Sequence, residues 1–253
     1  MEELNGKAAL VTGASRGIGA AAAIELAKSG VAVVLAARSE AQLADVKAEI
    51  EAAGGRAEVA ACDVGRYGDV AAAVDLCCER FGGLDILVNN AGIIEPIARL
   101  AESDPAGWDM AVDINLKGVY HGLRAALPPM LENGGGTIVN ISSGAATGVL
   151  EGWSHYCSTK AAVLSLTRCA DLEYRGQGIR VLGLSPGTVA TDMQVAIKAS
   201  GINPISQLDP SVHIPAFWAG RAVAWLCTRA ADPFRGTDFA LRSEENRALV
   251  GLA

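Results

Sequence analysis

Short apolar runs alternate with longer helix-like stretches along almost the whole chain, and this alternation limits the possible folds most strongly. Several runs are continuously apolar, which is typical of strands covered on both faces. They lie at Ala8–Val11, Val31–Ala36, Ala57–Ala61, Leu84–Val88, Thr137–Ile141, Ile179–Leu184 and Thr237–Leu241. The stretches between them contain much Ala, Leu and Glu, with apolar residues spaced about four apart, which favours helices. These lie at Gly17–Ser29, Glu40–Ala53, Asp69–Arg80, Asp104–Leu131, Tyr156–Arg175 and Pro215–Arg229.

This order of elements predicts an α/β fold, a doubly wound parallel sheet of about seven strands with helices on both faces. The chain has 253 residues, and α/β folds of roughly 250 residues occur as one domain. No repeat, linker or shift in composition divides the sequence, so residues 1–253 are expected to form a single domain. Residues 187–214 break the pattern with Gly, Pro and weakly periodic apolar residues. Because long irregular inserts are often binding loops, this segment is expected to be a lid over the substrate.

Composition and charge exclude several classes of protein. The chain carries 21 Lys and Arg against 28 Asp and Glu, a net charge of −7, which argues against a nucleic-acid binder. Its 51% hydrophobic and 19% charged residues exclude disorder. No apolar run reaches the ~18–20 residues of a membrane span, and the N-terminus lacks a signal-peptide pattern. The six cysteines match no metal motif, so we expect reduced thiols, no metal and a cytoplasmic location.

A glycine-rich loop directly follows the first expected strand. It reads Thr12-Gly13-Ala14-Ser15-Arg16-Gly17-Ile18-Gly19 and leads into the first expected helix. Glycine permits a tight turn, close approach of the backbone to a pyrophosphate and close packing of helix on strand. The N-terminus of the helix then offers unpaired N–H groups to the anion. The context between strand and helix therefore indicates a dinucleotide-binding loop.

This TGxxxGxG loop resembles the signature of the short-chain dehydrogenase/reductase family, and further motifs of that family follow in order. They are Asp63 after the third strand, Asn89-Asn90-Ala91-Gly92 after the fourth, and Pro186-Gly187 with the later Thr191. The resemblance implies a single-domain Rossmann fold that moves a hydride between NAD(P) and a carbonyl or alcohol, as in 3-oxoacyl reductases and carbonyl reductases. The residues it implies for cofactor binding are Gly13, Ser15, Arg16, Gly17, Ile18, Gly19, Arg38, Asp63, Val64, Asn89, Ala91, Gly92, Tyr156, Lys160, Pro186, Gly187, Val189 and Thr191.

The end of the second strand bears on the choice of cofactor. An acidic residue there would accept hydrogen bonds from the ribose 2′-hydroxyl and repel a 2′-phosphate. This chain has Ala37 at that place, followed by Arg38, and Arg16 is a second guanidinium expected to aim at the same region. Two guanidinium groups without a carboxylate favour a phosphate. We therefore predict that the cofactor is NADP(H), with NAD(H) as the alternative. The alternative role for Arg16 and Arg38 is that of solvated charges on the surface that bind no phosphate.

Tyr156 and Lys160 are four residues apart, so on a helix they share one face. A phenol has an ordinary pKa of about 10, and a nearby ammonium group together with the positive nicotinamide ring is expected to lower it. Tyr156 can then exchange a proton with the substrate oxygen as a general acid and base.

The resemblance supplies two further candidates for the catalytic group. Ser143 lies 13 residues before Tyr156, the usual place of the catalytic serine in the family, where its hydroxyl would orient the substrate oxygen. Its neighbour Ser142 should point the other way because side chains alternate along a strand. Asn115 matches the catalytic asparagine of the family, which holds a water that links Lys160 to solvent. The predicted catalytic residues are thus Asn115, Ser143, Tyr156 and Lys160.

Three segments are expected to frame the substrate, namely Ile93–Ile97, Gly144–Trp153 and the insert after Gly187. Most of their side chains are apolar, which suggests a hydrophobic ketone or alcohol. These side chains are Ile93, Ile94, Val149, Leu150, Trp153, Met193, Val195 and Ile197. For His155 we favour a structural or pocket-lining role, and the sequence leaves the role of Glu95 open. The competing functions are a regulator that binds the cofactor without turnover and a relative that runs other chemistry, such as dehydration, epimerisation or dehalogenation. The physiological substrate, stereochemistry and direction of the reaction stay open.

The C-terminal segment departs from the commoner pattern of the family. Many relatives end the last strand with a G-x-x-x-x-V-D-G-G-like segment, where this chain has the residues from Phe234 to Leu241 and then a charged stretch, Arg242 to Arg247. The resemblance also implies a homotetramer or homodimer built on the two long helices, here Asp104–Leu131 and Tyr156–Arg175. No nucleic-acid or membrane partner is expected.

Overall fold

The computed structural model describes residues 1–252 and contains one seven-stranded sheet. The strands stand in the order β3-β2-β1-β4-β5-β6-β7, and all neighbouring pairs are parallel. Each of the seven predicted strands is confirmed. The strand order reverses between β1 and β4, which is where ligands bind in folds of this type. The strands are β1 (Ala8–Thr12), β2 (Ala32–Ala37), β3 (Arg56–Ala61), β4 (Ile86–Asn89), β5 (Gly136–Ile141), β6 (Ile179–Ser185) and β7 (Asp238–Ala240).

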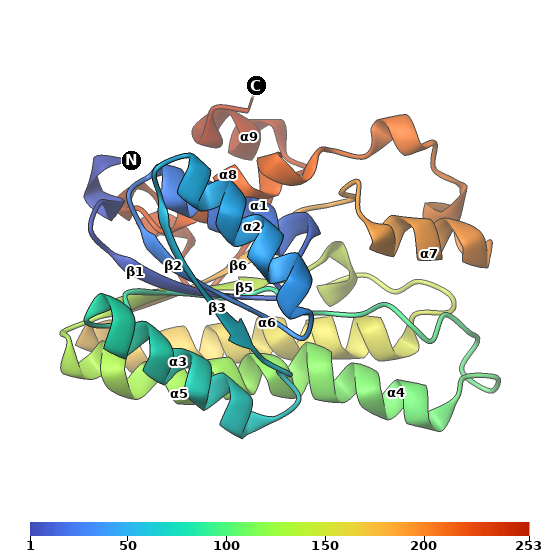
Figure 1. Ribbon diagram of the computed structural model, residues 1–253. Helices are drawn as coiled ribbons and strands as arrows, with labels where there is room; N and C mark the ends of the chain where they lie inside the picture. Colours follow the sequence, from blue (N-terminus) through green and yellow to red (C-terminus); the bar gives the residue numbers. More distant parts are fainter. Residues whose placement is uncertain (253) are drawn as a thin grey trace.

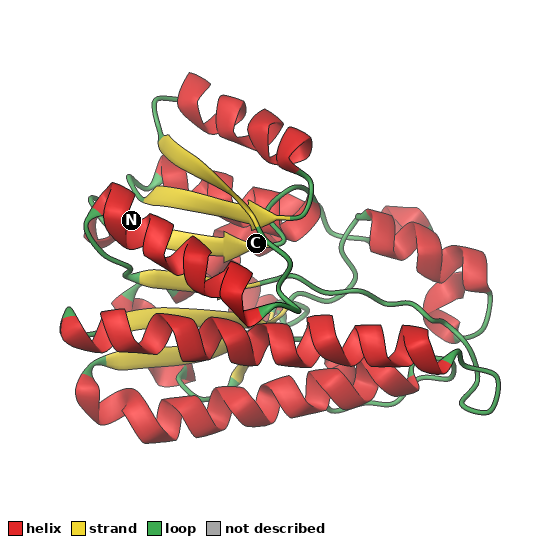
Figure 2. Cartoon of the chain, turned by 60° about the horizontal axis from the view of Figure 1, so that its bottom comes forward, coloured by secondary structure: helices red, strands yellow, loops and turns green. Residues whose placement is uncertain are grey.

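Helices cover both faces of the sheet, as predicted (Figures 1 and 2). One face packs on α1 (Gly17–Lys28), α2 (Glu40–Ala52), α8 (Ala216–Leu226) and α9 (Glu244–Val250). The other face packs on α3 (Tyr67–Phe81), α5 (Gly118–Glu132) and α6 (Ser154–Tyr174). Helix α4 (Pro105–Val112) lies before α5 in the chain and contacts α6. The central strands are buried on both sides, which explains why their sequences are apolar without alternation. The architecture is the predicted Rossmann-type fold.

One predicted helix is divided in the structure. A single turn of π-helix, Asp113–Lys117, joins α4 to α5 within the stretch expected as one helix. Asn115 lies in this turn and is fully buried. Turns of π-helix inside longer helices are frequent at functional sites.

The segment 187–214 is more regular than the sequence suggested. It contains helix α7 (Asp192–Ser200) and two short 3-10 turns, Pro204–Gln207 and Pro210–Val212. Its two ends are paired, since Val189 and Ile214 form a parallel bridge and the Ala190 N–H donates to the Ile214 carbonyl at 2.9 Å. Helix α7 projects beyond the carboxyl ends of the strands (Figure 1).

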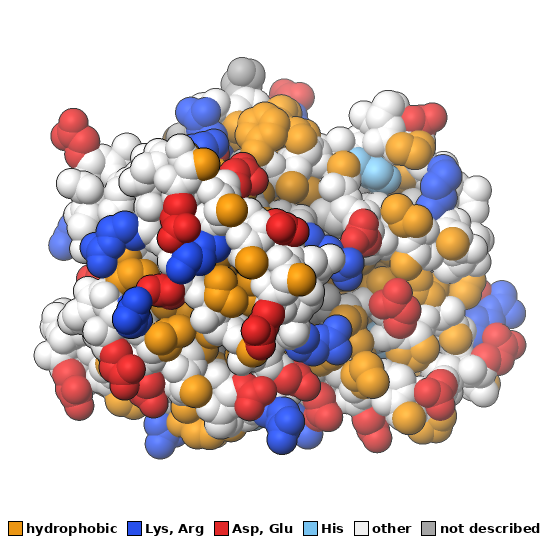
Figure 3. Space-filling view, in the orientation of Figure 1, with side chains coloured by type: hydrophobic (Ala, Val, Ile, Leu, Met, Phe, Trp, Pro, Cys, Tyr) orange, Lys and Arg blue, Asp and Glu red, His pale blue; other side chains and the backbone are white. Residues whose placement is uncertain are grey.

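Helix α9 overlaps the charged stretch Arg242–Arg247, for which no helix was predicted. The Ser243 side chain caps it by accepting a hydrogen bond from the Asn246 N–H, and the Arg221 side chain donates to the Val250 carbonyl. Within residues 1–252, no helix is long and apolar enough to cross a membrane. On the face shown in Figure 3, acidic and basic side chains are intermixed.

Candidate active site

The glycine loop leaves no room for larger residues. Gly13 and Gly17 have φ values of 62° and 58°, which L side chains rarely adopt. A Cβ on Gly19 would lie 2.2 Å from the Gly13 carbonyl oxygen and 2.5 Å from Asn90 Nδ2. Helix α1 begins at Gly17 with no side chain capping its first N–H groups. The loop therefore has the close backbone approach and the free helix N-terminus that a pyrophosphate group requires.

Asn90 and Thr12 join the loop to the segment after β4. Asn90 Nδ2 donates to the carbonyls of Thr12 and Gly13 at 2.9 and 3.1 Å. The Thr12 hydroxyl oxygen accepts from the N–H groups of Asn90 and Ala91 at 3.0 and 3.2 Å. Neither residue was among the predicted site residues, although both lie in the motifs that carried the resemblance. These hydrogen bonds hold the glycine loop after β1 next to the segment after β4, at the place where the strand order reverses.

The prediction for Asn89 needs correction at its side chain. Asn89 is buried, and its Nδ2 donates to Asn140 Oδ1 at 2.9 Å inside the helix-covered face of the sheet. A Cβ on Gly122 of α5 would lie 2.1 Å from Asn89 Oδ1. The amide is thus enclosed between β4, β5 and α5, so only the backbone of Asn89 remains to face a nucleotide.

Tyr156, Lys160 and Ser143 come together at the carboxyl end of β5. Tyr156 and Lys160 lie one turn apart near the start of α6, and they are 8% and 4% exposed. Lys160 Nζ donates to the Ile141 carbonyl at 2.7 Å and lies 5.7 Å from the centre of the Tyr156 ring. Ser143 begins a 3-10 turn, Gly144–Ala146, directly after β5, and its oxygen accepts from the Ala145 N–H at 3.2 Å.

The electrostatics of Tyr156 differ from the expectation. Burial raises the pKa of the phenol above its ordinary value of 10.0, and the neighbouring Ser143 hydroxyl opposes this by favouring the phenolate. Burial also lowers the pKa of the Lys160 ammonium from 10.5 to about 8, against an opposing effect of Asp238. The largest influence on the phenol is thus its burial, which acts in the direction opposite to the effect expected of the ammonium and the nicotinamide ring.

Asn115 lies beside this group, but its side chain is fully engaged. Its Oδ1 accepts from the Ile93 N–H at 2.8 Å, and its Nδ2 donates to the Ile93 carbonyl at 2.9 Å. A Cβ on Gly92 would lie 3.3 Å from Asn115 Oδ1 and 3.9 Å from Lys160 Nζ. Asn115 thus holds the segment after β4 in register and brings Gly92 against the lysine.

Ser142 points away from Ser143, as predicted. Its hydroxyl donates to Asp238 Oδ2 at 2.7 Å. Asp238 was not among the predicted residues, because it lies 96 positions away in the part of the chain that departs from the family pattern.

The two arginines expected at the cofactor phosphate have different surroundings. Arg16 Nη1 forms an ion pair with Asp192 Oδ2 at 2.9 Å, which joins the glycine loop to α7. Both side chains are largely exposed. Arg38 is exposed just after β2 and has no ion-pair partner within residues 1–252. The expectation of two free guanidinium groups is thus corrected for Arg16, whose charge already has a partner.

The other residues predicted for cofactor binding lie at the carboxyl ends of the strands. Ser15 and Ile18 belong to the glycine loop and the start of α1, and Asp63 and Val64 follow β3. Asp63 Oδ1 accepts from the Gly65 N–H at 3.0 Å. Ala91 and Gly92 follow β4, while Pro186, Gly187, Val189 and Thr191 lie between β6 and α7. The Thr191 methyl would be 3.2 Å from a Cβ on Gly17. The glycine loop and the segment that leads into α7 therefore meet at this edge.

A separate apolar cluster lies next to Tyr156. Trp153 packs edge-on to the Tyr156 ring with centroids 5.5 Å apart. Val149 and Val195, which were also predicted to frame the substrate, lie outside this buried cluster and are 89% and 69% exposed. The buried members are Ile94, Ala145, Trp153, Tyr156, Cys157 and Ile197, with Ile97, Leu150, Met193, Ala196 and Ile205 packed against them.

His155 is buried beside the site and has a structural contact. Its Nε2 lies 2.7 Å from the Ile94 carbonyl, so Nε2 carries the proton and donates. Burial lowers the pKa of its ring. His155 is therefore neutral at neutral pH, and its hydrogen bond holds the segment after β4 against α6. Glu95, whose role the sequence left open, is exposed.

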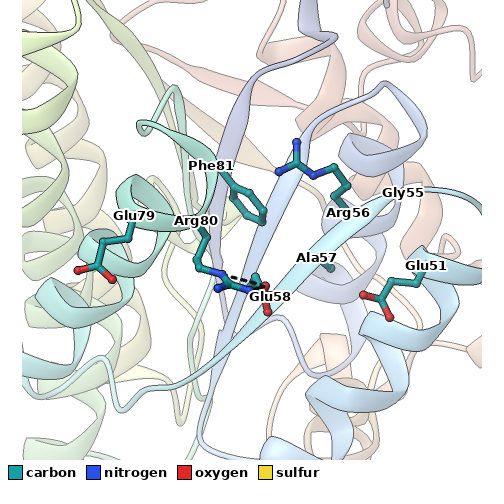
Figure 4. Close-up of a pocket in the computed structure, with 8 residues that line it drawn as sticks. All are labelled: Glu51, Gly55, Arg56, Ala57, Glu58, Glu79, Arg80 and Phe81. Carbon is teal, nitrogen blue, oxygen red and sulfur yellow. Dashed lines mark hydrogen bonds and ion pairs between the residues drawn. The ribbon is translucent and has the colours of Figure 1, made fainter.

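A hollow of about 330 Å³ lies elsewhere, at the amino end of the edge strand β3 (Figure 4). It is lined mainly by charged side chains, and Arg80 pairs with Glu58 across it. Because it lies at the opposite end of the strands from Tyr156, it is no part of the candidate site. Residues 1–252 contain no group of His, Cys, Asp and Glu suited to a metal ion.

Comparison with known proteins agrees with the geometry. The family model for short chain dehydrogenase matches residues 7–200. The chain belongs to this family. It is 32% identical to a cyclohexanol dehydrogenase of Acinetobacter over 240 residues, which are 94% of each chain. It is 40% identical to a 3-oxoacyl-[acyl-carrier-protein] reductase of Staphylococcus aureus over 196 residues, 76% of this chain and 78% of that one. A short-chain type dehydrogenase/reductase from Mycobacterium marinum superposes with a TM-score of 0.87 at 31% identity, covering 94% of each chain. The protein is therefore an oxidoreductase of a family that uses nicotinamide cofactors.

Proposed function

We propose that this protein is an NADP(H)-dependent oxidoreductase that transfers a hydride between the nicotinamide and a hydrophobic ketone or secondary alcohol. The observation that carries the proposal is the group of buried Tyr156 and Lys160 with Ser143 at the carboxyl end of the sheet, beside a loop whose Gly13 and Gly19 have no room for a Cβ. The apolar cluster around Trp153 and Ile94 supports a hydrophobic substrate.

The residues at the sheet edge fit a dinucleotide. The free N–H groups of α1 and the glycines at 13, 17 and 19 suit a pyrophosphate, and Arg38 suits a 2′-phosphate because no carboxylate stands at position 37. When bound, the nicotinamide would supply or accept the hydride. Lys160 and the segment from Pro186 to Thr191 would hold its ribose and ring.

The chain's own residues would handle the proton. Ser143 would donate a hydrogen bond to the substrate oxygen and hold it beside Tyr156. Because burial keeps the phenol of Tyr156 protonated, Tyr156 is ready to donate its proton to the oxygen of a ketone as it is reduced. Lys160, one turn along α6, would then offset the negative charge left on the phenolate. In the direction of alcohol oxidation the same proton returns to Tyr156.

The central test is turnover by the intact protein. NADPH is mixed with ketones, keto esters and aldehydes, and oxidation of the cofactor is followed by its absorbance. We expect Tyr156→Phe to reduce kcat by several powers of ten while NADPH binding stays nearly unchanged. Near-normal turnover by that variant would refute the assignment. Confirmed NADPH binding with no turnover on the whole panel would favour the regulator.

Cofactor preference needs its own test, because an alcohol dehydrogenase that prefers NAD is the second candidate. The free charge of Arg38 favours NADP(H), whereas the pairing of Arg16 with Asp192 weakens that argument. Replacing Ala37 by Asp and Arg38 by a neutral residue is expected to move the ratio of kcat/KM toward NAD. If the ratio did not move, position 37 and Arg38 would not select the cofactor.

We also propose that residues 1–253 act as one domain in the cytoplasm, with 187–214 as a lid. Asn203 supports the lid by donating to the Glu151 carbonyl at 3.0 Å, which ties the segment to the loop before Tyr156.

A homotetramer or homodimer through α5 and α6 is supported by exposed apolar side chains on both helices, Tyr120 and Leu172. Light scattering coupled to gel filtration tests the assembly, and a monomer would contradict it.

A further inference from the structure

Asp238 lies in an unusual place for a carboxylate. It opens β7, the strand at one edge of the sheet, and falls outside residues 7–200 that match the family. Phe239, the next residue, packs with Trp225 and Phe234 on the face covered by α1 and α8. Since side chains alternate along a strand, Asp238 faces the opposite side, toward α6.

The neighbouring strand makes room for this carboxylate. Gly183 on β6 is the register partner of Asp238, and a Cβ on Gly183 would lie 2.4 Å from Asp238 Oδ1. Oδ2 accepts the Ser142 hydroxyl at 2.7 Å, whereas Oδ1 is covered from solvent and has no hydrogen-bond partner within residues 1–252. A covered, half-satisfied carboxylate is costly unless a nearby positive charge compensates for it.

The compensating charges come from α6. Burial raises the pKa of the Asp238 carboxyl above its ordinary value, and the Ser142 hydroxyl and the positive charges of Lys160 and Arg168 oppose this rise. Of the two cations, Lys160 is buried and Arg168 is exposed. Ile141 and Ser142 are consecutive residues at the end of β5; the first accepts a hydrogen bond from Lys160 and the second donates one to Asp238. The ammonium and the carboxylate are therefore fixed to the same piece of backbone.

Burial lowers the pKa of Lys160, and within residues 1–252 the carboxylate of Asp238 is the charged group that opposes this. The remaining polar groups near it are uncharged at neutral pH, namely Tyr156 on its own helix and Asn115 across Gly92. Among the side chains that the structure describes, Asp238 is thus the charge that offsets the burial of this ammonium.

We propose that Asp238 is a positioning residue whose negative charge, acting through space at the end of β5, keeps Lys160 in its ammonium form in the working pH range. This inference rests on the proposed function, in which charged Lys160 stabilises the phenolate of Tyr156. Without the carboxylate, Lys160 would lose its proton at lower pH. The pH above which ketone reduction fails would then fall.

The test is the pH profile of kcat/KM for ketone reduction in Asp238→Asn, which keeps the shape and removes the charge. We expect the alkaline limb to move down by about half to one pH unit. Ser142→Ala keeps the charge and removes the hydrogen bond, so its limb should stay in place. Asp232→Asn is the matched control, since Asp232 pairs with Arg180 and not with Lys160. An unmoved limb in Asp238→Asn would overturn the inference.

A second measurement does not depend on turnover. In protein labelled with ¹³C at the lysine Cε atoms, the Lys160 signal is assigned by its loss in Lys160→Met and is titrated in wild type and Asp238→Asn. We expect the Lys160 midpoint to fall by the same amount as the limb. Asp238→Thr serves if Asp238→Asn does not fold. If the Lys160 midpoint in Asp238→Asn equals that of wild type, the proposed role of Asp238 is overturned and the proposed function is not affected. If the midpoint shifts but the wild-type protein shows no turnover, the proposed function is refuted.

Discussion

The buried ammonium of Lys160 should weaken the fold at neutral pH. Its pKa is lowered from 10.5 to about 8, a shift of about 2.5 pH units that corresponds to about 3 kcal/mol. Below pH 8 the lysine is charged in both the folded and the unfolded state, so the full cost of burying the charge is present. As the pH rises from 8 toward 10.5, the folded state releases its proton first and the cost disappears.

Lys160→Met removes this cost together with the bond to the Ile141 carbonyl. Leaving that carbonyl unpaired costs about 1–2 kcal/mol, so the variant should be more stable than wild type by about 1–2 kcal/mol near pH 7. The advantage should shrink by about 2 kcal/mol between pH 7 and 9.5, because wild type gains stability there.

The assay is unfolding by urea at several pH values, followed by circular dichroism. Other groups titrate in the same range, and subtracting the wild-type curve from that of the variant at each pH cancels them. Tyr156→Phe serves as a control because it leaves Lys160 in place. A difference in free energy of unfolding that stays constant from pH 7 to 9.5 would refute the reasoning, since it would mean that burial does not move the pKa of Lys160.

Two further outcomes test the nucleotide edge. Gly19→Ala should weaken NADPH binding, measured by calorimetry, at least about tenfold, because the new Cβ would lie 2.2 Å from the Gly13 carbonyl oxygen. Gly68→Ala is the control and should leave NADPH binding unchanged, because no atom lies within 4 Å of its Cβ position. Asp192→Asn should lower KM for NADPH about threefold and leave KM for NADH unchanged, since it releases Arg16 for the 2′-phosphate; an unchanged or higher KM for NADPH would show that Arg16 does not reach that phosphate.

Much of the fold could be predicted because its signals are local. The central strands β1 and β4 are continuous apolar runs because helices cover both faces of the sheet, and the glycine loop has a pattern set by its own backbone. The π-helical turn at Asn115 could not be predicted, because the residues around it suit an ordinary helix. Its side chain is instead held by Ile93, which is remote in sequence.

The electrostatics of the site depend on contacts that no local pattern shows. The spacing of Tyr156 and Lys160 predicts that they are neighbours, which is confirmed by the 5.7 Å between the ammonium and the ring. It does not show that both are buried, and burial reverses the expected shift of the Tyr156 pKa. Likewise, the sequence around Arg16 predicts a free charge, because it does not show that α7 places Asp192 within ion-pair distance of Arg16.

The same burial gives the site a preferred protonation state. With the phenol protonated and the ammonium charged below about pH 8, the pair holds the proton that ketone reduction consumes. Losing that proton leaves a phenolate in surroundings that disfavour it, so the phenolate is stable only while positive charge remains beside it. Within residues 1–252, Lys160 is the buried cation next to Tyr156, and Asp238 is the carboxylate that opposes the loss of its charge. In this proposal the strength of Tyr156 as an acid depends on Asp238 of β7, which lies outside the residues that match the family model.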